Sequence, residues 1–242
     1  MSKHSASSQG MVHEAHGFLD YHGALFIGHF GLAFGAKRVA PAVSLGALFL
    51  ACQFADLLWP TLVLLGVEQV AVEPGLTAVT PLNFVSYPYS HSLLMLCVWG
   101  ALIAVVYAVA TRSRAAAAVT LGLLVVSHWI LDVATHRPDL PLTPTGAARF
   151  GLGLWASVPG TLLVEFAIFT AGVWLYTRAT RPRDRIGRIG FRTLVAFLAV
   201  VMIANVFGPP PPSAMAVAWS AQAIWLLVVW GYWVDHHRMP RQ

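Results

Sequence analysis

Charged residues are scarce in this chain. Of its 242 residues only 10% are Asp, Glu, Lys or Arg, whereas 57% are hydrophobic. A soluble domain of this length needs far more polar surface, so that class of protein is excluded. The apolar residues come in blocks of about 20, the length of a helix that crosses a bilayer. The sequence therefore predicts an all-α, polytopic transmembrane bundle that forms one integral membrane domain over residues 1–242.

Cysteine is also rare. The two cysteines, Cys52 and Cys97, both lie in apolar blocks, so we expect reduced core residues and no disulfide framework. Residues 1–20 are polar and rich in histidine, which predicts no cleavable signal peptide and makes the first apolar block the targeting element. The chain shows no internal repeat and no linker that would join a second domain.

Hydropathy and helix-breaking residues predict about seven spans, or six if the weakest is discounted. The weakest is the first, because His22 and His29 interrupt it. In the second, Trp59-Pro60 predicts a kink or an end. Residues 67–90 form the longest connection, which we expect to be an ordered external cap on the membrane surface. The predicted spans are 21–37, 41–66, 91–111, 115–135, 156–178, 192–208 and 213–234.

Basic residues are distributed unequally between the two sides of this arrangement. The side of the N-terminus carries three of them, which are Lys3, Arg137 and Arg149. The other twelve fall on the opposite side, which are Lys37, Arg38, Arg112, Arg114, Arg178, Arg181, Arg183, Arg185, Arg188, Arg192, Arg238 and Arg241. Because positive charge stays cytoplasmic, we expect the N-terminus outside and the C-terminus inside.

The net charge of +5 raises the question of a nucleic-acid partner. The basic residues punctuate the apolar blocks, which is typical of topology determinants and predicts no nucleic-acid binding. The run "RATRPRDRIGRIGFR" contains the expected basic cytoplasmic loop, residues 179–191, which would touch anionic lipid.

Ionisable residues within the predicted spans gather in the outer half of the bilayer. They are His29, Asp56, His91, His128 and Asp132. A charge in hydrocarbon costs at least about 2.5–3.5 kcal/mol, and no Lys or Arg lies inside the spans to pair with the carboxylates. Histidines and a metal cation are the available partners, and the i, i+4 spacing puts His128 and Asp132 on one helical face. A lone histidine or aspartate is more often a packing residue, but five in one leaflet favour a shared functional site.

Further polar residues could take part in such a site. Ser90 flanks His91 at a helix start, where N–H and hydroxyl groups favour a ligand, and Glu165 in the fifth span is either a base or a satisfied glutamate. We treat Ser90 and Glu165 as candidate catalytic residues. His136 continues the stripe of His128 and Asp132.

Histidines near the two termini are weaker candidates. His13, His16 and His22 could extend the site, and His22 shares a helical face with His29. The segment "DHHR" at 235–238 is expected to be solvated on the inner side.

Four short motifs carry a resemblance to a known family. "GHFGLAFGAK", "ADLLWP", "YSHSLL" and "SHWILDVAT" occur in the order found in the bacterial inner-membrane metal-dependent hydrolase family, which the chain resembles over residues 28–145. The family has a Gly-His motif, an Asp-rich motif, a Thr-His-Ser-Leu-Leu motif and a Ser-His followed by Asp. The resemblance implies a multi-pass protein of the bacterial inner membrane. The metal ligands that it implies are His29, Asp56, His91, His128 and Asp132.

The second motif departs from the family pattern. The family has Pro-Asp-x-Asp-His-Pro, but here Leu58 and Trp59 stand in place of a carboxylate and a histidine. Ser86 and Tyr87 stand where the family has His-Arg. If the family site holds two metals, the loss of these ligands implies one metal here, and the loss of hydrolysis altogether is the alternative.

The function that we expect is a membrane-embedded metal-dependent hydrolase with its site in the outer half of the bilayer. Histidine and carboxylate donors suit zinc, with manganese or iron as alternatives. An amphiphilic substrate such as a lipid or a lipid-linked phosphoester could enter laterally. The alternatives are a transporter or permease that binds an ion or proton at the same cluster, and a non-catalytic accessory protein. A transporter usually has polar residues in both halves of the membrane and often an inverted repeat. The inner halves of the predicted spans have almost no polar residues, and the chain shows no repeat. The sequence therefore favours the enzyme.

Overall fold

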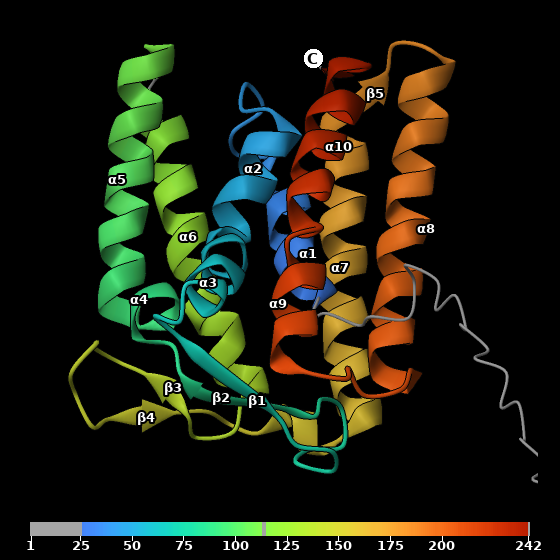
Figure 1. Cartoon of the computed structure of the whole chain (residues 1–242). Helices are drawn as coiled ribbons and strands as arrows, with labels where there is room; N and C mark the ends of the chain where they lie inside the picture. Colours follow the sequence, from blue (N-terminus) through green and yellow to red (C-terminus); the bar gives the residue numbers. More distant parts are fainter. Residues whose placement is uncertain (1–25, 113–114, 242) are drawn as a thin grey trace, which may run out of the picture.

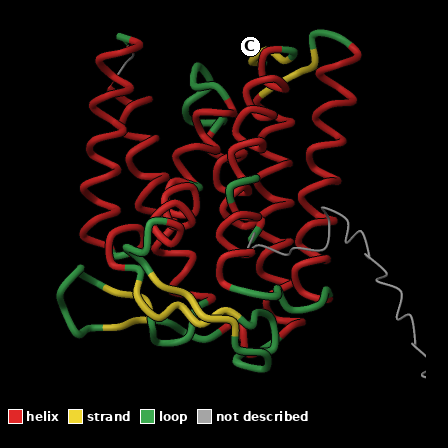
Figure 2. The backbone as a smooth tube through the Cα atoms, in the orientation of Figure 1, coloured by secondary structure: helices red, strands yellow, loops and turns green. Residues whose placement is uncertain are grey.

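The long helices of this protein stand side by side, and short strands lie at the two ends of the bundle (Figure 1). The computed structural model describes residues 26–112 and 115–241. The polar tail of residues 1–20, with His13 and His16, lies outside the described residues, as does His22. The arrangement of helix, strand and loop along the chain is shown in Figure 2.

Helices make up most of the chain. They are α1 (Ile27–Ala36), α2 (Leu45–Cys52), α3 (Phe54–Leu64), α4 (Pro88–His91), α5 (Leu93–Thr111), α6 (Ala115–Thr135), α7 (Val158–Ala179), α8 (Arg185–Phe207), α9 (Ala214–Ala221) and α10 (Ile224–His236), with a 3-10 turn at Leu154–Ala156.

Short strands also occur, which an all-α fold did not predict. They are β1 (Gln69–Val72), β2 (Leu82–Ser86), β3 (Leu140–Pro141), β4 (Arg149–Phe150), β5 (Thr180–Pro182) and β6 (Arg238–Pro240). Each pairs antiparallel with one other, giving β1–β2, β3–β4 and β5–β6. The β1–β2 hairpin gives the 67–90 segment its ordered form.

Five helical segments in the described residues are long and apolar enough to cross a membrane. They are α5, α6, α7, α8 and the stretch Ala214–His236, and the bent pair α2–α3 raises the number to six. Helix α1 has only ten residues and is almost wholly buried. The structure thus supports a multi-pass membrane protein of five to six spans, whereas a seventh span and the orientation of the termini stay predictions.

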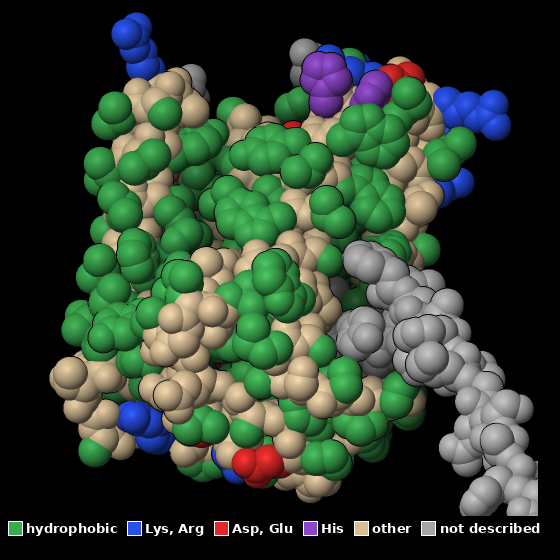
Figure 3. Space-filling view, in the orientation of Figure 1, with side chains coloured by type: hydrophobic (Ala, Val, Ile, Leu, Met, Phe, Trp, Pro, Cys, Tyr) green, Lys and Arg blue, Asp and Glu red, His purple; other side chains and the backbone are tan. Residues whose placement is uncertain are grey.

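The outward faces of these helices are apolar. Exposed side chains include Val105 on α5, Leu123 on α6, Leu163 on α7, Val200 on α8 and Leu226 on α10. Figure 3 shows hydrophobic side chains along the visible face of the bundle, with charged side chains near its two ends. This is the surface that a bilayer would cover.

One cysteine lies in the core and the other does not. Cys52 is buried at the end of α2, whereas Cys97 is exposed on α5, so its assignment to the core was wrong. Both are free thiols. Residue 97 faces outward because α5 packs chiefly on α6 and leaves the rest of its surface open.

The second apolar segment breaks at Gln53. Helices α2 and α3 meet there at an angle of 56°, and the backbone of Gln53 leaves the helical region with φ −101° and ψ 11°. The kink expected at Trp59-Pro60 was therefore misplaced, since Pro60 lies inside α3. A helix end leaves carbonyl groups without helical partners, and the carbonyl of Cys52 is consequently available to a side chain from another helix.

Charged residues at the end with the C-terminus are more buried than expected. Arg238 is only 6% exposed, and its guanidinium lies 4.6 Å from the ring centroid of Phe191 and donates to Thr180 Oγ1. The expectation that "DHHR" is solvated was therefore wrong for Arg238, because β6 pairs with β5 and carries the side chain inward. The predicted basic loop 179–191 is also shorter, because α8 already begins at Arg185, capped by Asp184.

Candidate metal site

The five predicted ligands come from four helices that meet near the β1–β2 end of the bundle. His29 lies in the first turn of α1, Asp56 in the first turn of α3, and His91 ends α4. His128 and Asp132 lie on α6. The four other than Asp56 are at most 5% exposed. The structure brings all five side chains together, although they span about a hundred positions of sequence.

Four ligand atoms form a compact set. The Nε2 atom of His91 lies 3.4 Å from Asp56 Oδ1 and 3.8 Å from Asp132 Oδ2. The Nε2 atom of His128 lies 3.7 Å and 3.4 Å from the same two oxygens. Direct N–H···O hydrogen bonds are shorter, about 2.7–3.2 Å. Donors around one tetrahedral zinc, at bonds of about 2.1 Å, are separated by roughly 3.4 Å. Ligand atoms of Asp56, His91 and His128 all lie within 4.8 Å of one another, so these three side chains could share a cation.

His29 adds a fifth donor beside this set. Its Nε2 atom lies 3.3 Å from Asp132 Oδ1, and its ring centroid lies 4.0 Å from that of His128. Both ring nitrogens are buried without a hydrogen-bond partner among the described residues. Ligand atoms of His29, His128 and Asp132 also lie within 4.8 Å of one another. Asp132 is thus placed between the four-atom set and His29.

The second ring nitrogen of His128 determines which tautomer the neutral ring adopts. His128 Nδ1 lies 2.8 Å from the carbonyl oxygen of Cys52, which can only accept a hydrogen bond. The hydrogen of the neutral ring is therefore on Nδ1. Its Nε2 is left with a lone pair directed toward the oxygens of Asp56 and Asp132.

His91 is fixed in the same tautomer by side chains. Its Nδ1 lies 2.7 Å from Ser90 Oγ, whose hydroxyl donates to Glu68 Oε2 at 2.6 Å. Because the Ser90 hydrogen is already donated, its oxygen accepts from Nδ1–H. The Nε2 lone pairs of His91 and His128 thus face the carboxylates of Asp56 and Asp132. A cation bound between the nitrogens and the oxygens would attract both. The donor set therefore fits a divalent metal.

The two candidate catalytic residues have other contacts. Ser90 is fully buried, and its hydroxyl orients His91 through the bonds just described. Glu165 on α7 accepts a hydrogen bond of 2.6 Å from the backbone N–H of Gly28. It therefore caps the first turn of α1, the helix that carries His29, and its role as a base stays a prediction.

A small cavity adjoins the donor atoms. It measures about 20 Å³, enough for one water-sized species, and is lined by His29, Asp56, His91, Asp132, His136 and the aromatic side chains Phe26, Trp59, Phe84 and Trp155. The indole of Trp59 lines the same cavity as the ligand side chains.

His136 belongs to the wall of this cavity. Its Nδ1 lies 3.0 Å from Asp139 Oδ1, which also accepts from the hydroxyl of Tyr87 at 2.9 Å. Burial alone would raise the pKa of Asp139, but the hydrogen bonds from His136, Arg137 and Tyr87 outweigh it and hold the pKa below its ordinary value. Asp139 is therefore an anion that orients the imidazole of His136.

Sequence reasoning missed the residues that orient His91 and His136. Glu68, Asp139 and Tyr87 lie in connections between helices, where nothing in the local pattern indicates which helix each will contact. Glu68 offered one weak signal, a lone carboxylate in the apolar run "LLGVEQV". It is only 1% exposed.

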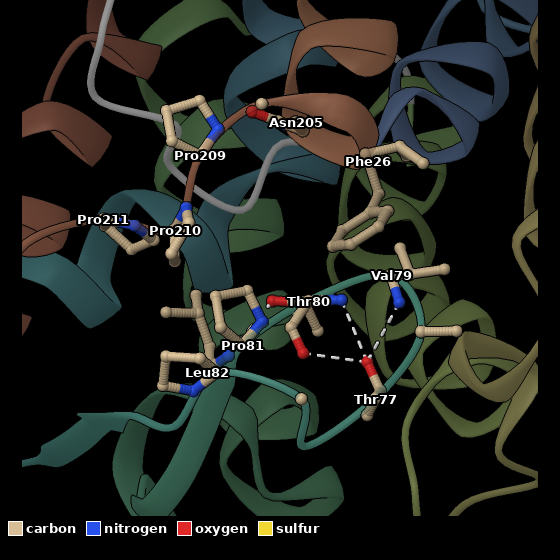
Figure 4. A pocket seen from close by; sticks show the side chains of 15 residues that line it. Phe26, Thr77, Val79, Thr80, Pro81, Leu82, Asn205, Pro209, Pro210 and Pro211 are labelled. Atoms are coloured by element: carbon tan, nitrogen blue, oxygen red, sulfur yellow. Dashed lines mark hydrogen bonds between the residues drawn. The ribbon is translucent and has the colours of Figure 1, made fainter.

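A larger pocket lies on the other side of Phe26 (Figure 4). It measures about 190 Å³ and is lined by Phe26, by residues of the loop 74–82 and by Asn205, Val206, Gly208 and Pro209–Pro211. None of its lining side chains is charged. The hydroxyl of Thr77 forms hydrogen bonds within this loop: it accepts from the N–H of Thr80 and donates to the carbonyl oxygen of Thr80 (Figure 4). Phe26 lines both this uncharged pocket and the cavity beside the histidines.

No family model, curated protein or solved structure matches the chain. Membership of the family that the four motifs resemble consequently stays a prediction.

Proposed function

We propose that this protein is a membrane-embedded, metal-dependent hydrolase with one divalent metal held by His91, His128, Asp56 and Asp132, beside His29. One observation carries the proposal: two imidazoles have their Nδ1–H groups engaged elsewhere and direct Nε2 lone pairs at two carboxylates, at distances suited to a shared cation. Histidine nitrogen and carboxylate oxygen donors favour zinc, and manganese or iron are the alternatives.

A zinc ion bound there would activate water by lowering its pKa and would polarise a phosphoryl or acyl oxygen. His136, oriented by Asp139, would take up or release a proton at its other ring nitrogen. The aromatic side chains around the cavity would exclude bulk water from the reaction. The uncharged pocket beyond Phe26 suits the hydrocarbon part of an amphiphilic substrate, such as a lipid-linked phosphoester.

A second candidate is a structural zinc centre in a membrane accessory protein. Four protein donors can fill a tetrahedral shell, and a closed shell is typical of structural zinc. The small volume of the cavity favours this candidate as well. The two candidates agree on the metal and differ in whether turnover occurs.

Elemental mass spectrometry of the purified protein tests the metal. We expect about one zinc per chain in the wild type and none in His128→Ala or Asp132→Ala, because each loses one donor of a buried set. His237→Ala is the control, since its ring pairs with Asp184 at the opposite end of the bundle. A wild-type protein that holds no metal and takes up no added zinc, manganese or iron would overturn the proposal.

Hydrolysis of decyl phosphate and of a decanoyl ester then separates the two candidates. A hydrolase should cleave one of them, and His136→Gln should keep its zinc and lose cleavage. Zinc binding without cleavage of either compound, together with a large loss of thermal stability on chelation, would favour the structural centre.

A further inference from the structure

A buried hydrogen-bond chain reaches His91 from the connection between α3 and β1. Its outer member is Glu68, whose Oε1 accepts from the backbone N–H groups of Tyr89 and Ser90 at 2.8 Å and 2.9 Å. Its Oε2 accepts from the Ser90 hydroxyl at 2.6 Å, and Ser90 Oγ lies 2.7 Å from His91 Nδ1. Glu68, Ser90 and His91 are each at most 3% exposed. Water does not compete with these contacts, so the chain has a definite direction.

The direction follows from the acceptor at the outer end. A carboxylate has no hydrogen to donate, so the Ser90 hydroxyl must donate to Glu68. The Ser90 oxygen can then only accept from the imidazole, which requires hydrogen on Nδ1 of His91. The Nε2 lone pair is consequently free for a ligand bond on the side of Asp56.

We infer that Glu68 is a positioning residue that selects the metal-binding tautomer of His91 through Ser90. The inference rests on the metal site proposed above. Outer carboxylates that orient a ligating histidine typically change metal affinity by about 10- to 100-fold. His128 is oriented by a main-chain carbonyl, which a substitution does not remove. The orientation of His91 can be tested by substitution, because it depends on the side chain of Glu68.

An isosteric substitution should reverse the chain. In Glu68→Gln the amide oxygen must face the N–H groups of Tyr89 and Ser90, because its NH₂ group would meet two donors there. The NH₂ group then faces Ser90 Oγ and donates to it. The Ser90 hydroxyl is thereby turned to donate to His91 Nδ1, which moves the ring hydrogen to Nε2 and blocks the ligand position. The number of hydrogen bonds is unchanged, so the fold is preserved.

The full-length protein in detergent is the material for the test, and zinc affinity is measured by competition with a chromophoric chelator. We expect Glu68→Gln to weaken zinc about 10- to 100-fold while its unfolding temperature stays near that of the wild type. Glu73→Gln is the matched control, since the exposed Glu73 lies at the other end of β1 and accepts a hydrogen bond from Asn83. Cobalt(II) absorption gives an independent readout, and the tetrahedral spectrum of the wild type should weaken in Glu68→Gln alone.

The outcomes separate this inference from the proposed function. A wild type that binds no zinc would overturn the metal site itself. If the wild type binds zinc and a folded Glu68→Gln binds zinc with the same affinity, the role of Glu68 alone is overturned. If Glu68→Gln does not fold, Ser90→Ala replaces it. That variant cuts the chain and should also weaken zinc, and an unchanged affinity would again contradict the inference.

Discussion

At the scale of single residues, the tautomer of each histidine in this site depends on what its second ring nitrogen contacts. His128 meets a main-chain carbonyl and His91 meets a serine hydroxyl, and both contacts leave Nε2 for the carboxylates. His29 has no such contact in the described structure. We therefore expect His91 and His128 to be the stronger ligands. The ring of His29 is not held by a hydrogen bond, so we expect it to reorient when Asp132 binds a metal.

Glu165 gives a prediction at the same scale. In Glu165→Ala the buried N–H of Gly28 loses its acceptor, which should lower the free energy of unfolding by about 1–3 kcal/mol. Glu165→Gln keeps an oxygen at that place and should lose less. Chemical unfolding in detergent, followed by circular dichroism, measures both, with the exposed Glu73→Gln as the control. Equal stability of Glu165→Ala and the wild type would show that this cap contributes nothing.

Between elements, α1 and α7 pack with their backbones in contact. A Cβ at Gly172 would lie 1.9 Å from the carbonyl oxygen of Gly31, so the two backbones touch directly. Small residues permit such contacts between membrane helices. The same contact places His29, two residues before Gly31, against α7.

We expect Gly172→Ala to push α1 away from α7 and to destabilise the protein by about 1–3 kcal/mol, the usual cost of overpacking. Gly35→Ala, on the same face of α1, is the control because its Cβ would lie 3.4 Å from the flexible Leu175 side chain and 3.8 Å from Gly172 Cα, which is ordinary contact distance for the backbone. Thermal unfolding of the two variants gives the comparison. A Gly172→Ala protein no less stable than Gly35→Ala would contradict the close packing.

An ion pair joins α1 to α10 at the other end of the bundle. Lys37 Nζ lies 2.7 Å from Asp235 Oδ2, and Asp235 Oδ1 accepts from the hydroxyl of Tyr176 on α7 at 3.0 Å. Because Lys37 is only 3% exposed, Asp235→Leu alone should leave a buried charge unpaired and cost about 3–5 kcal/mol. The double variant Lys37→Met with Asp235→Leu should recover part of that loss in a double-mutant cycle. Additive effects of the two single changes would mean that the pair is not coupled.

For the whole molecule, the prediction concerns orientation in the membrane. The twelve-to-three division of Lys and Arg predicts that the β1–β2 hairpin is external and the β5–β6 ribbon cytoplasmic. Reporter fusions after Thr77 should therefore show external activity, and fusions after Arg185 should show cytoplasmic activity. External activity after Arg185 would reverse the orientation and place the His/Asp site on the cytoplasmic side.

Much of the architecture could be predicted from composition and local pattern. The membrane class, the positions of α5, α6 and α7, and the five ionisable residues at one level all follow from the properties of individual segments. A span is recognised by its own length and hydropathy, and a buried histidine or aspartate within it is conspicuous because its cost in hydrocarbon is high.

Other features were decided only by the tertiary structure. The contact of His128 with the carbonyl of Cys52, the chain from Glu68 to His91 and the contact of Tyr87 with Asp139 all depend on partners from distant parts of the sequence. Hydropathy identifies where a polar group costs free energy in hydrocarbon, but it does not identify the group that forms a hydrogen bond with it. That assignment requires the relative positions of packed helices and connections, because a hydrogen bond depends on distance and direction within a few tenths of an ångström.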